Sequence, residues 1–255
     1  MPEKRNVWTH DETVVALGLY FKISFSKCNM FHPEVKRVAK LLGRNPSALA
    51  MKIINLARLD PTLQRQGISG LKNGAKMEKE VWHEYEGKLD CLAEDLDRLL
   101  KGSGNAPHEA DEDLKVPAGM DVVRLAKFRV NQSFFRRAVL SAYETTCCLT
   151  GISEPKLLIA SHIKPWAECT EGNEKTTPEN GLCLNTLHDR AFDRGLITID
   201  SSYKVVLSSS LKSALTVKVF NDYFGKYDGV SIRLPVHHLP SKTYLEYHNN
   251  HVFQS

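Results

Sequence analysis

The sequence predicts an α+β protein with a helical N-terminal half and a C-terminal half that mixes short strands with helices. Three observations carry this prediction. Apolar residues recur at helical spacing up to residue 98, short apolar runs alternate with turn residues after residue 119, and a Gly-, Ser-, Pro- and acid-rich stretch separates the two parts. We therefore expect a helical domain at 1–98, a linker at 99–118 and a second domain at 119–255.

Composition places the chain among ordinary water-soluble proteins. A formal net charge of +4 is mild, so it permits a nucleic-acid partner without requiring one. The six cysteines are irregularly spaced, which is typical of a reduced compartment rather than of a disulfide framework. Neither a signal peptide nor an apolar run of about 20 residues is visible, so we expect a cytoplasmic protein with no membrane partner.

The first half predicts helices with well-marked ends. Thr9 and Glu12 form the Thr-x-x-Glu pattern of a capping box before the apolar run "TVVALGLYFKI". A second helix at "EVKRVAKLL" is expected to end at Gly43. A third helix follows, with Asn45 as its cap and Pro46 in its first turn.

The short turn between the second and third helices gives this half a helix-turn-helix-like pattern. Leu49, Ile53 and Leu56 share one helical face and are expected in the core. Between 36 and 76 basic residues dominate and Asp60 is the only acid, which favours a face that follows a DNA backbone. The candidate DNA contacts of this half are Arg44, Lys52, Asn55 and Arg58. A solvated helical bundle with a chance separation of charge is the alternative.

The second half predicts a long amphipathic helix, short strands and further helices. The helix at 127–144 has a candidate buried stripe made of Phe134, Phe135, Val139, Leu140 and Tyr143. "CCLTGI" and "KLLIASHI" are expected to be strands, "LHDRAFDRG" a short helix closed by Gly195, and "LITID" with "KVVLS" a hairpin. Two more helices are expected at "SALTVKVFNDYFGKY" and "SKTYLEYHNNHVF". The tail histidines are expected at the surface: His237, His238, His248 and His251.

Three polar residues fall at the ends of these predicted elements. His162 ends the second strand, Asn180 lies late in the loop that follows, and His188 opens the helix. In this order they resemble the HNH nuclease motif, also called the ββα-metal fold. The stretch "RVNQSFFRRAVLSAYETTCCLTGI…LLIASHIKPW…PENGLCLNTLHDRAFDRGLITID" resembles HNH proteins found among predicted restriction endonucleases, and the first half resembles, more loosely, the helical domain that often precedes such a nuclease.

The resemblance implies hydrolysis of DNA phosphodiester bonds with a divalent cation, Mg²⁺ or Mn²⁺. It implies that His162 is the general base, that His188 is a metal ligand, and that Asn180 holds the loop so that the His162 ring points correctly. A neutral imidazole suits a base near neutral pH because its unperturbed pKa is about 6.5. A cation on the scissile phosphate absorbs the charge that develops there.

Ser161 departs from the family pattern, because many relatives carry Asp or His just before the base as a further metal ligand. Serine is a poor ligand, so Asp193 becomes the nearest further candidate; bracing of the helix is its alternative role. Mg²⁺ tolerates few protein ligands, since it keeps several waters and leans on substrate phosphates.

A second departure concerns the zinc knuckle of many HNH proteins, which is built from two Cys-x-x-Cys pairs. The corresponding positions here are Cys147 with Thr150, and Leu184 with Leu187. A tetrahedral zinc site needs four good ligands, so no structural zinc is expected. We expect these positions to be packed by apolar contacts.

The leading hypothesis is therefore a metal-dependent endonuclease of double-stranded DNA, of the restriction or antiviral defence type. Arg190, Arg194 and Lys164 are candidate phosphate contacts, with solvated helix charges as the alternative. One HNH site cuts one strand, so a homodimer would supply the second cut. Two other functions stay open: a DNA-binding regulator whose HNH domain is inactive, and an RNA-cutting toxin, although a recognition helix does not fit the major groove of A-form RNA.

Overall fold

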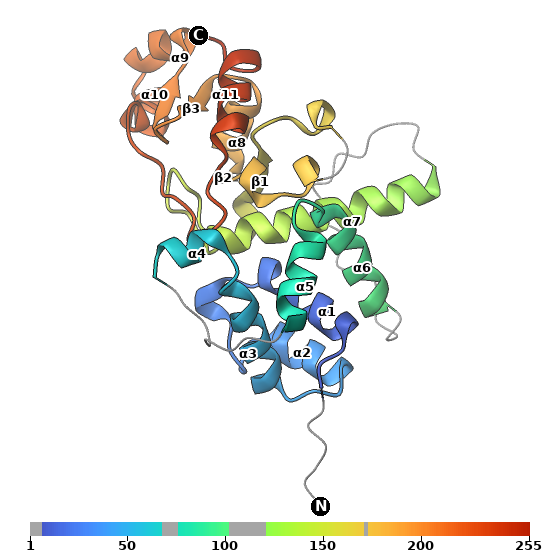
Figure 1. Ribbon diagram of the computed structural model, residues 1–255. Coiled ribbons are helices and arrows are strands. Elements are labelled where there is room, and N and C mark those ends of the chain that lie inside the picture. The colour runs from blue at the N-terminus through green and yellow to red at the C-terminus, as the bar shows by residue number, and fades with distance from the viewer. Residues whose placement is uncertain (1–6, 68–75, 102–120, 171–172) are drawn as a thin grey trace, which may run out of the picture. The chain divides into compact units, whose positions relative to one another are not determined.

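The computed structural model describes residues 7–67, 76–101, 121–170 and 173–255 (Figure 1). The chain divides into two compact units, Met1–Arg137 and Ala138–Ser255, and each is described by itself. Most of the predicted linker lies outside the described residues; its first three residues belong to a helix. The predicted domain boundaries stay a prediction.

The described part of the first unit is built from helices. They are α1 (His10–Lys22), the 3-10 turn η1 (Phe25–Lys27), α2 (Pro33–Leu41), α3 (Pro46–Ala57), α4 (Pro61–Arg65), α5 (Lys76–Tyr85), α6 (Leu89–Lys101) and the first part of α7 (Val122–Ala142). Because α1 is buried along nearly its whole length, it is the central helix and packs against α3, α5 and α6. Gly18 of α1 lies so close to Leu96 of α6 that a Cβ there would collide with the leucine side chain.

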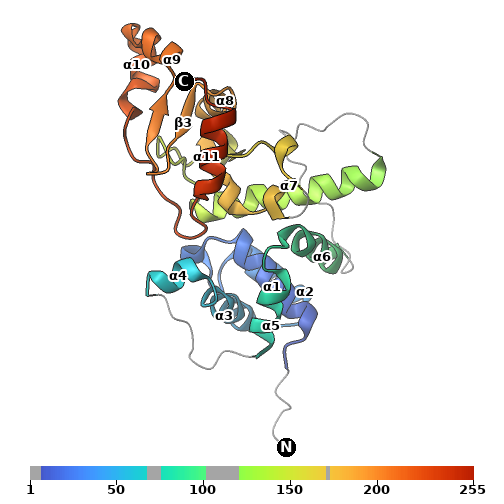
Figure 2. The same cartoon turned by 45° about the horizontal axis from the view of Figure 1, so that its top comes forward.

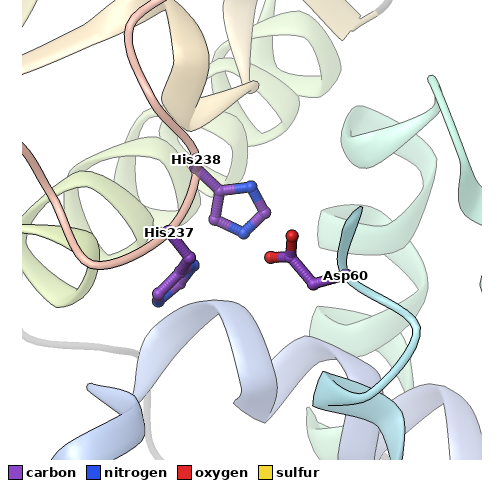
Figure 3. A group of neighbouring side chains, drawn as sticks. All are labelled: Asp60, His237 and His238. Atoms are coloured by element: carbon purple, nitrogen blue, oxygen red, sulfur yellow. The ribbon is translucent and has the colours of Figure 1, made fainter. Parts of the chain in front are cut away.

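The predicted helix ends of this unit are confirmed. Thr9 and Glu12 form both halves of the capping box of α1. Gly43 has a φ of 62°, the left-handed conformation that ends α2. Asn45 caps α3 with its side chain, and Asp60 (labelled in Figure 3) caps α4 by accepting a hydrogen bond from the backbone of Thr62.

The predicted core of α3 is also confirmed, since Leu49, Ile53 and Leu56 are buried. No helix of the described residues is long and apolar enough to cross a membrane.

The second unit contains two small antiparallel sheets with helices around them. Its elements are the end of α7, η2 (Pro155–Leu157), β1 (Leu158–His162), η3 (Trp166–Glu168), η4 (Asn173–Lys175), η5 (Pro178–Asn180), β2 (Gly181–Asn185), α8 (Thr186–Asp193), β3 (Ile197–Ile199), β4 (Val205–Leu207), α9 (Ser209–Ser213), η6 (Ala214–Thr216), α10 (Lys218–Tyr223), η7 (Gly225–Tyr227) and α11 (Lys242–His251). α8 packs against β1 and β2, and α11 lies beside β3 (Figure 2).

The predicted strand at "CCLTGI" is wrong. The N–H of Cys147 donates to the carbonyl of Ile152 at 2.8 Å, and the N–H of Gly151 donates to the carbonyl of Cys147 at 3.0 Å, so this segment closes as a tight turn. The partner of β1 is instead β2, which follows the loop. All five residues of β2 are buried, so it lacks the alternation that marks a half-exposed strand.

The register of the β1–β2 ladder sets the geometry of the candidate site. His162 pairs with Gly181 at one end, and Leu158 pairs with Asn185 at the other. Asn180 therefore lies immediately beside the end of β1, and its carbonyl accepts a hydrogen bond from the N–H of Ile163 at 2.9 Å. The start of α8, directly after Asn185, belongs to the opposite end of the ladder.

The remaining predictions for this unit are largely confirmed. β3 and β4 form the expected hairpin, Gly195 follows α8 with a φ of 66°, and α11 covers much of the last predicted helix. The surface positions predicted for His237 and His238 are wrong, because both residues are buried. The surface position predicted for His248 is wrong too. Its ring stacks on Phe192 at 3.7 Å between centroids and is 1% exposed, because α11 turns this face onto the core.

Candidate active site

His162 has one ring nitrogen fixed by the backbone. Its Nε2 lies 3.1 Å from the carbonyl oxygen of Lys175. Because a carbonyl oxygen can only accept, Nε2 carries the hydrogen, and in the neutral ring the lone pair is on Nδ1. Burial lowers the pKa of His162 to about 4, although the hydrogen bond to Lys175 partly opposes this. The ring of Trp166 meets the imidazole edge to face at 5.5 Å between centroids.

Asn180 is fully buried and uses both ends of its amide. Its Oδ1 accepts from the N–H of Lys164 at 2.8 Å. Its Nδ2 lies 3.2 Å from the carbonyl of Lys164 and 2.9 Å from the carbonyl of Glu174. The amide thus ties the chain just after β1 to the chain just before Lys175, whose carbonyl holds His162.

His188 is buried and both of its ring nitrogens already face oxygen acceptors. Nδ1 lies 3.0 Å from Oδ1 of Asn185, and Nε2 lies 2.9 Å from the carbonyl of Tyr223 at the end of α10. Burial lowers the pKa of His188. His188 also lines a surface pocket of about 650 Å³, together with Asn185, Asp222 and Lys226, and neither His162 nor Ser161 borders this pocket.

The three predicted metal ligands do not form a cation site as the chain is folded. Nε2 of His188 is occupied by the Tyr223 carbonyl. Asp193 is exposed and lies five residues along α8, which turns it about 140° away from His188. Ser161 is 2% exposed, points to the opposite face of β1 from His162, and its Oγ has no hydrogen-bond partner among the described residues.

The positions that correspond to a zinc knuckle are linked by hydrogen bonds through Asn185. Its N–H donates to Sγ of Cys147 at 3.3 Å and its Nδ2 donates to Oγ1 of Thr150 at 3.1 Å. Its Oδ1 meanwhile caps α8 by accepting from the N–H groups of Leu187 and His188. The predicted apolar packing is therefore confirmed only in part. Cys147 and Leu184 are buried, but Cys147 and Thr150 bind Asn185 through polar atoms and Leu187 is exposed.

Three of the four candidate DNA contacts in the first unit are held in internal ion pairs. Arg44 makes two hydrogen bonds of 2.7 and 2.6 Å to Glu12 and lies over the Trp8 ring. Lys52 and Arg58 both pair with Glu78, which is 1% exposed. The prediction that these three cations face DNA is not supported, because each of them already pairs with a carboxylate. Asn55 is half-buried and its Oδ1 has no hydrogen-bond partner among the described residues.

The phosphate-contact candidates of the second unit differ among themselves. Arg190 and Arg194 are exposed on α8. Lys164 is not free for phosphate, because its Nζ pairs with Glu174 at 2.8 Å and lies over the Tyr247 ring.

Sequence reasoning missed the pair formed by His238 and Glu179. His238 follows His237 on the segment before α11, with the two rings edge to face at 4.5 Å (Figure 3). Nδ1 of His238 lies 2.8 Å from Oε1 of Glu179, the residue before Asn180. Burial alone would raise the pKa of Glu179, but the charge and hydrogen bond of His238, with a hydrogen bond from Thr177, lower it to about 2. The adjacent "HH" was the available signal.

Comparison with known proteins finds a similarity within this unit. Residues 147–200, from the Cys147 turn through β3, match the model of an HNH endonuclease family. This segment holds His162, Asn180 and His188, and the match supports nuclease activity, which is a hydrolase reaction.

A particular solved structure is also similar in part. A modification-dependent TagI restriction endonuclease matches with a TM-score of 0.30 and 20% identity, over 46% of this chain and 37% of that chain. The chain thus spans well under half the length of that protein. No curated protein matches the chain.

Proposed function

We propose that the protein is a metal-dependent endonuclease that hydrolyses phosphodiester bonds of double-stranded DNA, with His162 as its general base. The observation that carries the proposal is the contact between Nε2 of His162 and the carbonyl of Lys175. It fixes the tautomer in which Nδ1 has the lone pair, and a base must offer a lone pair to the attacking water.

The proposed reaction is the attack of a water molecule on the phosphorus of a phosphodiester. Nδ1 of His162 takes a proton from water, the water oxygen bonds to phosphorus, and a bridging P–O bond breaks so that the leaving oxygen departs with its electron pair and collects a proton from solvent. With a pKa of about 4 the ring is neutral at pH 7 but is a weak base. The negative phosphate, once bound, favours the imidazolium and strengthens the base.

The proposed metal dependence rests on the HNH match rather than on the donor set. In this fold His188, Asp193 and Ser161 are not placed to bind one cation together. DNA as substrate, a restriction or defence role, a homodimer and a helix-turn-helix use of α2 and α3 belong to the same proposal. Of the candidate DNA contacts in the first unit, only Asn55 is outside an internal ion pair; exposed Lys36 and Lys40 on α2 are additional cations that face solvent.

The second candidate function is a DNA-binding regulator with an inactive HNH domain. The contact between Nε2 of His188 and the Tyr223 carbonyl favours it, because an HNH fold that cannot hold its cation would bind DNA without cutting it.

A plasmid assay tests both. Supercoiled DNA, unmodified or with modified cytosines, is incubated with the protein and Mg²⁺, Mn²⁺ or EDTA. We expect metal-dependent nicking or linearisation that His162→Ala abolishes without weakening DNA binding. The matched control is His83→Ala, an exposed histidine of the first unit. Cleavage unchanged in His162→Ala overturns the role of His162, and binding without cleavage of any substrate favours the regulator.

A further inference from the structure

The loop after β1 contains an ion pair for which the proposed hydrolysis gives no reason. Nζ of Lys164 lies 2.8 and 3.1 Å from the two carboxylate oxygens of Glu174. The two side chains are only 14% and 27% exposed. The pair joins Lys164, two residues after His162 at the end of β1, to Glu174, ten positions further along the chain.

Glu174 is held at its side chain and at its main chain. The backbone N–H and the hydroxyl of Thr170 donate to Oε2 of Glu174 at 2.8 and 2.9 Å. The carbonyl of Glu174 accepts from Nδ2 of Asn180 at 2.9 Å. A residue anchored at both places has little freedom to rotate its backbone.

The next carbonyl along the chain is the one that holds His162. Glu174 and Lys175 share the 3-10 turn η4, and this turn is braced by a 2.8 Å hydrogen bond from the N–H of Thr177 to the carbonyl of Asn173. Because Glu174 and Lys175 are consecutive residues of this hydrogen-bonded turn, fixing Glu174 fixes the direction of the Lys175 carbonyl. That carbonyl oxygen lies 3.1 Å from Nε2 of His162.

We infer that Lys164 and Glu174 form a positioning pair that aims the Lys175 carbonyl and so keeps the hydrogen of His162 on Nε2 and the lone pair on Nδ1. The functional part of this inference rests on the proposed function, and the tautomer part does not. Neither residue touches the reacting atoms. The alternative role of Lys164 is a direct contact with DNA phosphate.

The two roles predict opposite effects when Glu174 loses its charge. If Lys164 binds phosphate, Glu174→Gln releases the lysine and lowers KM, whereas Lys164→Met raises KM. If the two are a positioning pair, both variants lower kcat and leave KM unchanged. The double variant then costs no more than either single one, since the residues act as one unit.

A measurement independent of cleavage completes the test. The full chain, labelled with ¹⁵N on histidine, is examined by NMR so that the protonated nitrogen of His162 is read from its ring shifts. We expect the Nε2–H form in the unchanged protein and a mixture in Glu174→Gln. Loss of one hydrogen bond worth about 1 kcal/mol changes the tautomer ratio about fivefold. We expect kcat to fall in proportion to the measured fraction of Nε2–H, and so by less than the ratio.

Matched controls in the same unit are Lys156→Met and Glu246→Gln, both at exposed positions. Glu174→Asp, which keeps the charge, is expected to restore part of the Nε2–H population. An unchanged His162 tautomer in both Glu174→Gln and Lys164→Met overturns the inference. If the tautomer shifts but no DNA is cut by the unchanged protein, the positioning pair stands and the proposed hydrolysis fails.

Discussion

Asn180 holds Lys164 by both of its main-chain groups. The amide oxygen accepts from the N–H of Lys164 at 2.8 Å, and the amide nitrogen donates to its carbonyl at 3.2 Å. The Asn180 side chain thus makes for Lys164 the two hydrogen bonds that a neighbouring strand would make, just after β1 ends. The loop begins in a fixed direction for this reason.

We expect Asn180→Asp to keep the hydrogen bond that the side-chain oxygen accepts and to remove those that the amide nitrogen donates. The carboxylate keeps the acceptor for the N–H of Lys164 but loses both donors, so the part-buried carbonyls of Lys164 and Glu174 lose a partner. Each buried unsatisfied group costs about 1–3 kcal/mol, so the midpoint of urea unfolding should fall clearly. Asn180→Ala should fall further because it also loses the acceptor. Equal midpoints for Asn180→Asp and the unchanged protein would contradict this account.

The pH dependence of cleavage should report the lowered pKa of His162. Since the pKa is about 4, the ring stays neutral far below its ordinary value of 6.5. The kcat/KM of the free enzyme should therefore hold from pH 7 down to about pH 5 and fall by half near pH 4. Far-UV circular dichroism at each pH checks that the chain is still folded. A midpoint near 6.5 would show that the ring is fully hydrated.

His248 should make the fold sensitive to acid. Burial lowers its pKa from 6.5 to about 4, while the hydrogen bond to the Phe192 carbonyl partly opposes this. The unfolded chain therefore binds a proton between pH 6.5 and 4 that the folded chain does not. Stability is complete above 6.5 and falls as the pH drops to 4, by about 3 kcal/mol in all. In His248→Phe the slope of unfolding free energy against pH over this window should be smaller, whatever the change at pH 7.

Glu78 should be essential to the helical unit rather than to DNA binding. It is 1% exposed and pairs with Lys52 and Arg58, whose side chains are 6% and 13% exposed. Removing one partner of a buried ion pair costs about 3–5 kcal/mol, because a charge is left unpaired. We expect Glu78→Gln to lower the unfolding midpoint strongly. The triple variant Lys52→Met, Arg58→Met and Glu78→Leu, which leaves none of the three side chains charged, should recover much of it.

We expect the affinity of the helical unit for DNA to depend instead on its exposed lysines. Lys36→Glu with Lys40→Glu should weaken binding at low salt with no change in the unfolding midpoint. If the Lys36 and Lys40 changes have no effect while a stably folded Lys52→Met loses binding, the internal role of Lys52 is wrong.

His188 should behave as a clasp between α8 and α10. Its Nε2 meets the Tyr223 carbonyl and its Nδ1 meets the cap residue Asn185. His188→Phe should therefore lower stability but leave Mn²⁺ affinity, measured by electron paramagnetic resonance without DNA, unchanged. A tenfold loss of Mn²⁺ affinity would instead mean that α10 moves aside and frees Nε2 for the metal.

The elements with local signals were predictable from sequence. The capping box of Thr9 and Glu12, the Asn45-Pro46 start of α3 and the left-handed Gly43 and Gly195 all act within a few residues. β2 was missed as a strand because every residue in it is buried, so its pattern carries no period of two.

The site residues were predictable in kind but not in their partners. The order of His162, Asn180 and His188 follows from the chain, but the carbonyls of Lys175 and Tyr223 have no residue-type signature at all. Charge was the least reliable guide. The basic residues Arg44, Lys52 and Arg58 balance Glu12 and Glu78, which are distant in sequence, so a local count could not reveal the pairing.

In the β1–β2 ladder successive side chains point to opposite faces, so the position of a residue along β1 decides which face its side chain occupies. Ser161 and His162 are neighbours in sequence and face opposite sides of the strand. One residue added or removed within β1 would therefore place the buried Ser161 hydroxyl on the face that now presents the His162 ring. Between Lys164 and Asn180 the chain is outside the β1–β2 ladder, so this alternation does not apply there. A change of chain length after Lys164 leaves this alternation within β1 unchanged, so it would not exchange the faces that Ser161 and His162 present.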